Sequence, residues 1–148
     1  MSYYKTFDDT LLPNETLKNK LNITDEKILT IKKYTTAALH EVEFLKSKKK
    51  IISINDLYKI NEILFGTLYS WASKKRTYPL REGDHDFMDF RSFGQAEIYI
   101  NKLLESDNKK DELSNLDYAK LLDFINDMHP FREGNGCSTP YIFAVLSS

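Results

Sequence analysis

Residues 129–136 combine, within one short stretch, side chains that could act on a phosphate ester. The stretch reads His-Pro-Phe-Arg-Glu-Gly-Asn-Gly. The imidazole of His129 can accept a proton near neutral pH, and the carboxylate of Glu133 is the kind of ligand that Mg²⁺ favours. Asn135 lies between two glycines, and successive N–H groups in such a turn can bind an anion. A base, a metal ligand and an anion site on one loop predict phosphate chemistry.

Helices must position this loop, because the apolar residues before it repeat at spacings of three and four. We predict a first helix from an N-cap at Thr24 to about Lys48. Its apolar positions include Ile28, Ile31, Leu39, Val42 and Leu45. A second helix is predicted from about Asn55 to about Trp71. Its buried stripe is expected to consist of Leu57, Ile60, Leu64, Leu68 and Trp71.

Two further helices are predicted in the second half of the chain. One covers about 94–105 and is followed by a polar loop over 106–111. The other begins after Ser114, which is expected to cap it together with Asp117. The last helix delivers His129, and Pro130 marks its end.

Residues 74–92 interrupt the helical pattern and favour a short β-hairpin or extended flap, since they contain Pro79 and Gly83. The expected fold class is therefore mainly α, with one small β-hairpin. We expect residues 1–23 to form an N-terminal arm that packs on a single domain over residues 24–148.

Composition bounds the possible partners and the location. A chain of 148 residues that is 41% hydrophobic is long enough for one domain with a core. Its net charge of -1 argues against direct nucleic-acid binding by bulk charge. The single cysteine excludes an intrachain disulfide and is compatible with a reducing compartment. Without a membrane-length apolar run or a signal pattern, we expect a cytoplasmic protein with no membrane partner.

The loop closely resembles the signature of the Fic (filamentation induced by cAMP) family, which reads His-Pro-Phe-x-(Asp/Glu)-Gly-Asn-Gly-Arg-x-x-Arg. Residues 17–21 are similar to the arm before the first Fic helix. Residues 65–72, followed by Arg76, resemble the segment before the family's flap. The resemblance implies the helical Fic fold, with a β-hairpin flap beside the active-site loop.

The resemblance also implies an activity, which is AMP transfer from ATP to a Ser, Thr or Tyr hydroxyl of a target protein. His129 would be the general base, and Glu133 would hold Mg²⁺. The nucleotide phosphates would be bound by Gly134, Asn135 and Gly136. The flap would dock the target through Thr77, Tyr78, Leu80, Arg81, Phe87 and Phe90. Phe131 is expected to face the core, and Arg132 falls at a variable position to which we assign no catalytic role.

The chain departs from the signature after its eighth position. Cys137 and Pro140 stand where the family places two arginines that bind nucleotide phosphates. Loss of one such charge would cost about 2–4 kcal/mol, or roughly a hundred- to a thousandfold in rate. Only residues 141–148 follow, so the domain is expected to be shortened at its C-terminal end, which could favour a homo-oligomer.

Three interpretations follow from the sequence. The first is a Fic adenylyltransferase, weakened by the missing arginines, and the second is an inactive Fic-fold protein-binding module or pseudoenzyme. The third is a transferase that uses a different phosphate-containing donor. This sequence lacks the family's inhibitory (Ser/Thr)-x-x-x-Glu-(Gly/Asn) segment, so the resemblance implies that any regulation comes from a separate antitoxin-like inhibitor, as in a toxin-antitoxin pair, or from a region outside this sequence. A zinc protease is disfavoured, because no His-Glu-x-x-His pattern is present.

Overall fold

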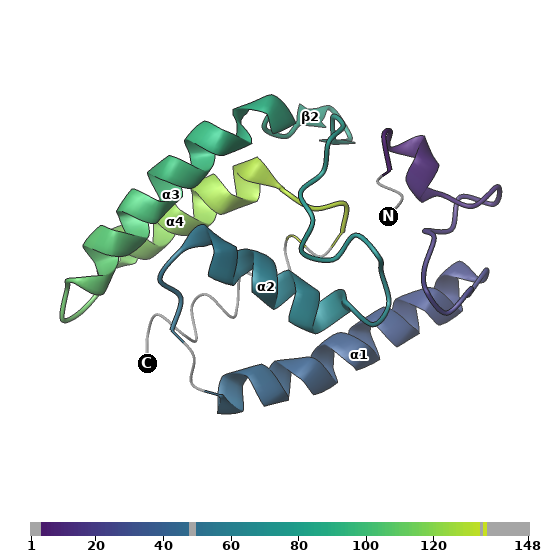
Figure 1. The fold of residues 1–148 in the computed structure, drawn as a ribbon, viewed down its shortest axis with the longest axis horizontal. Helices are drawn as coiled ribbons and strands as arrows, with labels where there is room; N and C mark the ends of the chain where they lie inside the picture. Colours follow the sequence, from purple (N-terminus) through teal and green to yellow (C-terminus); the bar gives the residue numbers. More distant parts are fainter. Residues whose placement is uncertain (1–3, 48–49, 134, 136–148) are drawn as a thin grey trace.

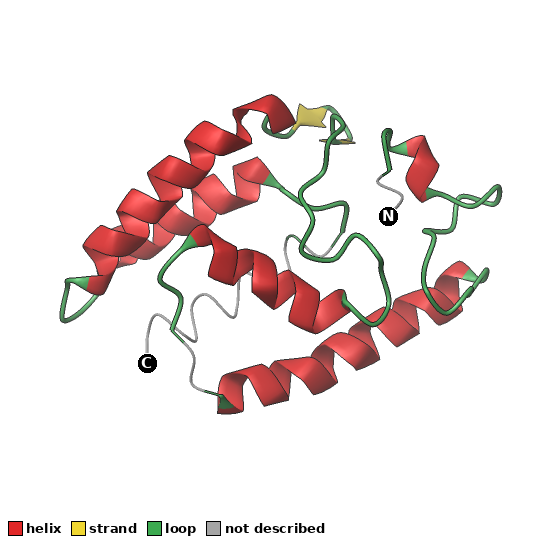
Figure 2. Cartoon of the chain, in the orientation of Figure 1, coloured by secondary structure: helices red, strands yellow, loops and turns green. Residues whose placement is uncertain are grey.

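The fold is built from helices and one small hairpin (Figures 1 and 2). The computed structural model describes residues 4–47, 50–133 and 135. In chain order the elements are the 3-10 helix η1 (Asp8–Thr10), α1 (Glu26–Lys46), α2 (Ile54–Phe65), β1 (Arg81–Glu82), β2 (His85–Asp86), the 3-10 helix η2 (Phe90–Ser92), α3 (Phe93–Asn108) and α4 (Asn115–Met128). The mainly α fold with a small hairpin is confirmed.

Helix α1 lies along α2, as Figure 1 shows. Its N-cap is Asp25, whose carboxylate accepts hydrogen bonds from the N–H groups of Lys27 and Ile28. The prediction of Thr24 as the cap was therefore wrong by one residue. A carboxylate suits this place because it meets unpaired N–H groups and the positive end of the helix dipole.

The buried face of α1 is narrower than its apolar pattern. Leu29, Ala37 and Phe44 are buried. The five apolar positions that indicated the helix are instead 40–67% exposed. The helical period was correct, but burial follows contact with α2, and the spacing alone does not reveal which face makes that contact.

Helix α2 ends at Phe65, so the predicted end near Trp71 was wrong. Gly66 follows, and its N–H donates to the Glu62 carbonyl at 2.7 Å. A Cβ on Gly66 would lie 2.5 Å from that oxygen, so this close approach requires glycine. All five residues of the predicted stripe are nevertheless buried. Leu68 and Trp71 reach the core from turns, which extends the apolar spacing beyond the helix.

Helices α3 and α4 run side by side (Figure 1). Helix α3 continues to Asn108, three residues into the predicted polar loop. The predicted cap of α4 is confirmed, because the Ser114 N–H donates to the Asp117 carboxylate at 2.9 Å and the Asp117 N–H donates to the Ser114 hydroxyl at 3.2 Å. Within the described residues, no helix has the length and apolar character needed to cross a membrane.

The N-terminal arm packs on the helical body through its backbone and its threonines. The Lys20 N–H donates to the Leu68 carbonyl at 2.7 Å. Thr10 and Thr16 are buried. The arm thereby brings η1 close to the loop that follows α4.

Candidate functional site

His129 ends helix α4 in the left-handed conformation, with φ 40°. Its backbone N–H donates to the Ile125 carbonyl, which completes the last helical turn. Its ring Nδ1 is hydrogen-bonded to the Asn126 carbonyl. Because a carbonyl oxygen only accepts, Nδ1 carries the proton in the neutral ring and Nε2 keeps its lone pair. The imidazole is therefore oriented as a base through Nε2.

The flap covers one face of the His129 ring. The rings of His129 and Phe87 stack with their centroids 3.7 Å apart and their planes 10° apart. Burial lowers the pKa of His129 below its ordinary value of 6.5, and this effect exceeds the opposing hydrogen bond to Asn126. At neutral pH the ring is thus uncharged and able to accept a proton.

The Glu133 carboxylate is engaged by two basic side chains. Lys33 Nζ, from α1, lies 3.2 Å from Oε1, and Arg132 Nη1 lies 3.8 Å from Oε2. The Glu133 side chain keeps 35% of its surface exposed. Because the Glu133 carboxylate is accessible and pairs with these two side chains, a metal cation could take the place of one of them.

Asn135 uses its side chain to close the loop. Its Oδ1 accepts from the Phe131 N–H at 2.9 Å, and its Nδ2 donates to the Phe131 carbonyl at 2.7 Å. Phe131 is buried, as expected, and its ring meets Tyr58 edge-on at 5.4 Å. Gly134 and Gly136 of the predicted phosphate site, together with Cys137 and Pro140, lie outside the described residues.

One cavity of about 290 Å³ brings the predicted residues together. Its lining consists of Phe7, Leu80, Arg81, Glu82, Phe87, His129, Arg132, Glu133 and Asn135. The base, the carboxylate and three of the predicted docking residues of the flap (Leu80, Arg81 and Phe87) therefore face one space. Phe7, from the N-terminal arm, closes it and carried no signal in the sequence.

The flap is a two-stranded antiparallel hairpin in which Arg81 pairs with Asp86 and Glu82 with His85. Gly83 adopts φ 60° in the turn, a conformation that glycine tolerates without strain. Of the other predicted docking residues, Tyr78 is buried, and burial raises its pKa to about 12.

Thr77 and Phe90 also lie outside the cavity lining. Thr77 Oγ1 donates to the Tyr4 carbonyl at 3.3 Å. Phe90 is partly buried and packs against the core.

Arg76 connects the flap to the end of α4. Its Nε donates to the His129 carbonyl at 2.8 Å, and its terminal nitrogens donate to the carbonyls of Tyr78, Met88 and Met128. The side chain is only 4% exposed. Arg76 therefore fixes the backbone that carries His129, a role that sequence reasoning did not assign.

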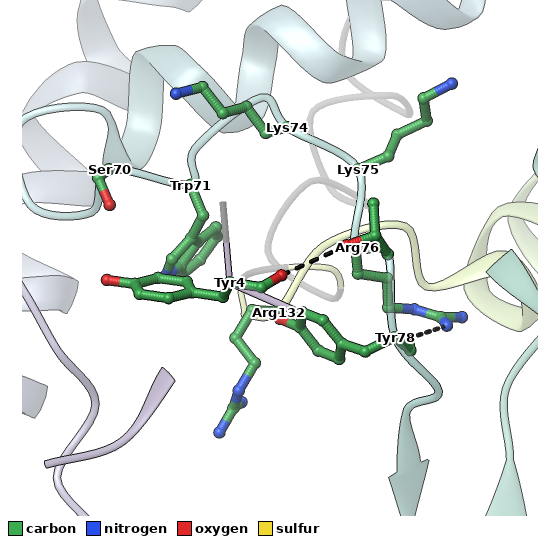
Figure 3. A pocket seen from close by; sticks show the side chains of 9 residues that line it. Tyr4, Ser70, Trp71, Lys74, Lys75, Arg76, Tyr78 and Arg132 are labelled. Atoms are coloured by element: carbon green, nitrogen blue, oxygen red, sulfur yellow. Dashed lines mark hydrogen bonds between the residues drawn. The ribbon is translucent and has the colours of Figure 1, made fainter. Parts of the chain in front are cut away.

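Arg132 connects the loop to the arm. Its Nε donates to Thr10 Oγ1 at 3.0 Å, and its guanidinium lies 4.1 Å from the centre of the Phe7 ring. Arg132 also lines a small cavity of about 30 Å³, which Figure 3 shows from close by. In Figure 3 its guanidinium points away from Lys74 and Lys75. Arg132 thus holds the arm against the site.

Asn61, on α2, is fully buried and supports the same loop. Its Nδ2 donates to the Glu133 carbonyl at 3.4 Å, and its Oδ1 accepts from the Ser73 N–H at 3.2 Å. Sequence reasoning missed this residue because a single asparagine in an apolar helix gives no indication of its partner.

We predict that Asn61→Leu lowers the free energy of unfolding by about 1–3 kcal/mol, because it leaves two backbone groups without their partner. Urea denaturation would measure this loss. The exposed Asn115→Leu is the matched control, and equal midpoints for the two variants would contradict the prediction.

A family profile and two curated relatives match the chain. The Fic/DOC family matches residues 51–146. Protein adenylyltransferase VbhT of Bartonella schoenbuchensis is 30% identical over 90 residues, which is 56% of this chain and 18% of VbhT. The match thus spans less than a fifth of that relative. The "Probable protein adenylyltransferase Fic" of Escherichia coli is 26% identical over 95% of this chain and 72% of the relative.

Solved structures share the fold. The N-terminal Fic domain of a VirB-translocated effector from Bartonella sp. AR 15-3 superposes with a TM-score of 0.84 at 22% identity, covering 99% of this chain and 74% of that domain. BepC from Bartonella tribocorum, solved with bound AMPPNP, gives a TM-score of 0.84 at 20% identity. The match covers 97% of this chain and 78% of BepC. At these identities the likeness establishes the fold.

Proposed function

The chain belongs to the Fic/DOC family, and on that premise we propose that it is a protein adenylyltransferase. It would transfer AMP from ATP to a Ser, Thr or Tyr hydroxyl of a target protein. The observation that supports this best is the cavity in which an oriented, neutral His129 faces Glu133 beneath the flap. Relatives named as adenylyltransferases support the same reaction class.

In the proposed reaction, His129 Nε2 takes the proton of the target hydroxyl. The hydroxyl oxygen then forms a bond to the α-phosphorus of ATP, while the bond from that phosphorus to the bridging oxygen breaks and pyrophosphate leaves. The Asn126 carbonyl, which accepts from Nδ1–H, stabilises the imidazolium that results. Phe87 excludes water from the face of the ring that it covers.

The residues of the cavity suit an Mg²⁺ ion that would enter the site together with the nucleotide. Within the described part of the chain, no three His, Cys, Asp or Glu side chains form a group that could hold a metal. Mg²⁺ is commonly bound by one or two carboxylates together with substrate phosphates, and Glu133 supplies such a carboxylate. When bound, the ion would neutralise phosphate charge.

The target would dock on the flap. In the β1–β2 hairpin, Arg81 and Asp86 face each other across the strands at 3.3 Å and are exposed. A target segment could extend this hairpin by pairing backbone to backbone. Such docking would also serve a protein-binding module without transferase activity.

We predict that the transfer rate falls to half of its maximum only at a pH below 6.5. The reason is that His129 must be neutral, and burial lowers its pKa. The unfolded chain binds this proton more readily than the folded chain, so protonation below pH 6.5 also favours unfolding. Rate measurements across pH, with an NMR titration of the ring, check the prediction. A His129 midpoint above 6.5 would contradict it.

The donor and the competence of the site can be tested together. The unaltered chain and a Cys137→Arg/Pro140→Arg variant are incubated with lysate, Mg²⁺ and ATP that is labelled at either the α- or the γ-phosphate. Adenylyl transfer places only the α-label on protein, whereas γ-label would indicate a phosphoryl transferase. If only the Cys137→Arg/Pro140→Arg variant labels protein, the site of the unaltered chain is weakened by the missing arginines. No label and no nucleotide binding in either protein would refute the proposal.

A further inference from the structure

We propose that Lys33 is a phosphate-binding residue of this chain, reaching the nucleotide from helix α1. The inference rests on the proposed function, since it assumes a nucleotide beside Glu133. Lys33 Nζ lies 3.2 Å from Glu133 Oε1, although the two residues are 100 positions apart in the sequence. Its side chain is 15% exposed and lines the α1-side cavity, which meets the His129 cavity at Glu133.

The charge of the nucleotide favours such a residue. A bound nucleoside triphosphate carries several negative charges, yet residues 133–148 contain no lysine or arginine. Within this sequence, a basic side chain that contacts the phosphates would therefore come from before residue 133. Three described basic residues line the two cavities that meet at Glu133, namely Lys33, Arg81 and Arg132.

Two of these three cations form a hydrogen bond or an ion pair with a residue other than Glu133, whereas Lys33 has, besides Glu133, the Tyr34 ring centre at 4.8 Å. Arg81 pairs with Asp86 across the hairpin at 3.3 Å. Arg132 donates to Thr10 and lies over the Phe7 ring, contacts that hold the arm. Lys33 makes its ion pair with Glu133, the residue that the metal would take.

Metal binding would release Lys33 toward the phosphates. Mg²⁺ is commonly held by a carboxylate together with substrate phosphates, so a phosphate that shared the ion with Glu133 would lie beside that carboxylate. The ion also repels the ammonium from Glu133. The α1-side cavity contains the acidic Glu15 and Glu26, so we place the phosphates on the His129 side. Lys33 thus pairs with Glu133 before the nucleotide binds and with phosphate afterwards.

Calorimetry with two nucleotides tests this exchange. The probes are the Mg²⁺ complexes of AMP and of α,β-methylene ATP. In the second nucleotide, the bond between the α-phosphorus and its bridging atom cannot break. Lys33→Met, Lys33→Arg and the neighbouring exposed Lys32→Met are compared with the unaltered chain. Lys33→Met is expected to weaken the triphosphate analogue about tenfold to a hundredfold, and AMP less than about threefold. Lys33→Arg and Lys32→Met are expected to bind the analogue within about threefold of the unaltered chain.

The possible results separate the two proposals. If Lys33→Met binds the analogue as tightly as Lys32→Met does, the Lys33 inference fails, while α-label transfer by the unaltered chain would still support the enzyme. If Lys33→Met weakens both nucleotides equally, lowers the melting temperature and is not rescued by arginine, Lys33 only braces α1 against the loop. If the unaltered chain binds neither nucleotide, both proposals fail.

Discussion

Replacing Arg76 with methionine is expected to lower the free energy of unfolding by about 3–5 kcal/mol. The guanidinium donates to four backbone carbonyls, those of Tyr78, Met88, Met128 and His129. Two of these carbonyls are at the C-terminal end of α4, where a cation also meets the negative end of the helix dipole. Methionine fills similar volume but leaves those oxygens without donors.

Replacing the Arg76 side chain is also expected to disturb the flap and the backbone that carries His129. The guanidinium lies 4.9 Å from the Phe93 ring centre, and its nitrogens reach the carbonyls of Tyr78, Met88 and Met128. One side chain therefore joins the start of the flap, the flap's return at Met88 and the end of α4. The Arg76 backbone N–H, which donates to the Pro130 carbonyl at 2.7 Å, is kept in the variant. Lysine has only three donors on one nitrogen and cannot reproduce this fork. Arg76→Lys should recover only part of the stability.

Urea denaturation of Arg76→Met, Arg76→Lys and Arg91→Met would measure this effect. Arg91 is exposed and pairs only locally with Asp89 at 2.6 Å, so its replacement should leave the midpoint close to that of the unaltered chain. Equal midpoints for Arg76→Met and Arg91→Met would contradict the assigned role of Arg76.

Removal of the His129 imidazole is expected to slow label transfer by about 10²–10⁴-fold, the range typical of a lost general base. Two variants distinguish the loss of the general base from backbone strain at position 129. His129→Ala places a side chain with no local hydrogen bond at φ 40°. His129→Asn keeps a residue that tolerates this left-handed conformation but provides no base of comparable strength. Both variants should lose transfer.

The matched control for His129 is His40→Ala on α1. The buried Nδ1 of His40 has no hydrogen-bond partner within the described structure, so its loss leaves no group unsatisfied. Its transfer rate should stay within about threefold of the unaltered chain. Retained transfer in His129→Asn, with nucleotide affinity unchanged, would remove His129 from the proposed chemistry.

The sequence predicted the helical elements and the centre of the candidate site. Sequence patterns located all four described helices, and Ser114 with Asp117 marked the start of α4. It misplaced the end of α2 because Leu68 and Trp71 continue the apolar spacing from turns. Local patterns report periodicity, and they do not distinguish a buried turn from a further helical turn.

The residues that sequence reasoning missed act across long separations. Lys33 meets Glu133, Asn61 meets the Glu133 backbone, and Arg132 meets Thr10. None of these pairs shares a local spacing, since the partners come together only when α1, α2 and the arm pack around the loop. The motif therefore indicated the candidate reacting groups, whereas the side chains that hold them could be found only from the fold.

The central claim is that this chain transfers AMP to protein with His129 as the general base, and one measurement tests it most directly. The unaltered chain and His129→Asn are incubated with α-labelled ATP, Mg²⁺ and lysate, and protein-bound label is followed over time. We predict label from the unaltered chain and a rate at least about a hundredfold lower from His129→Asn. Equal labelling by the two proteins would contradict the account.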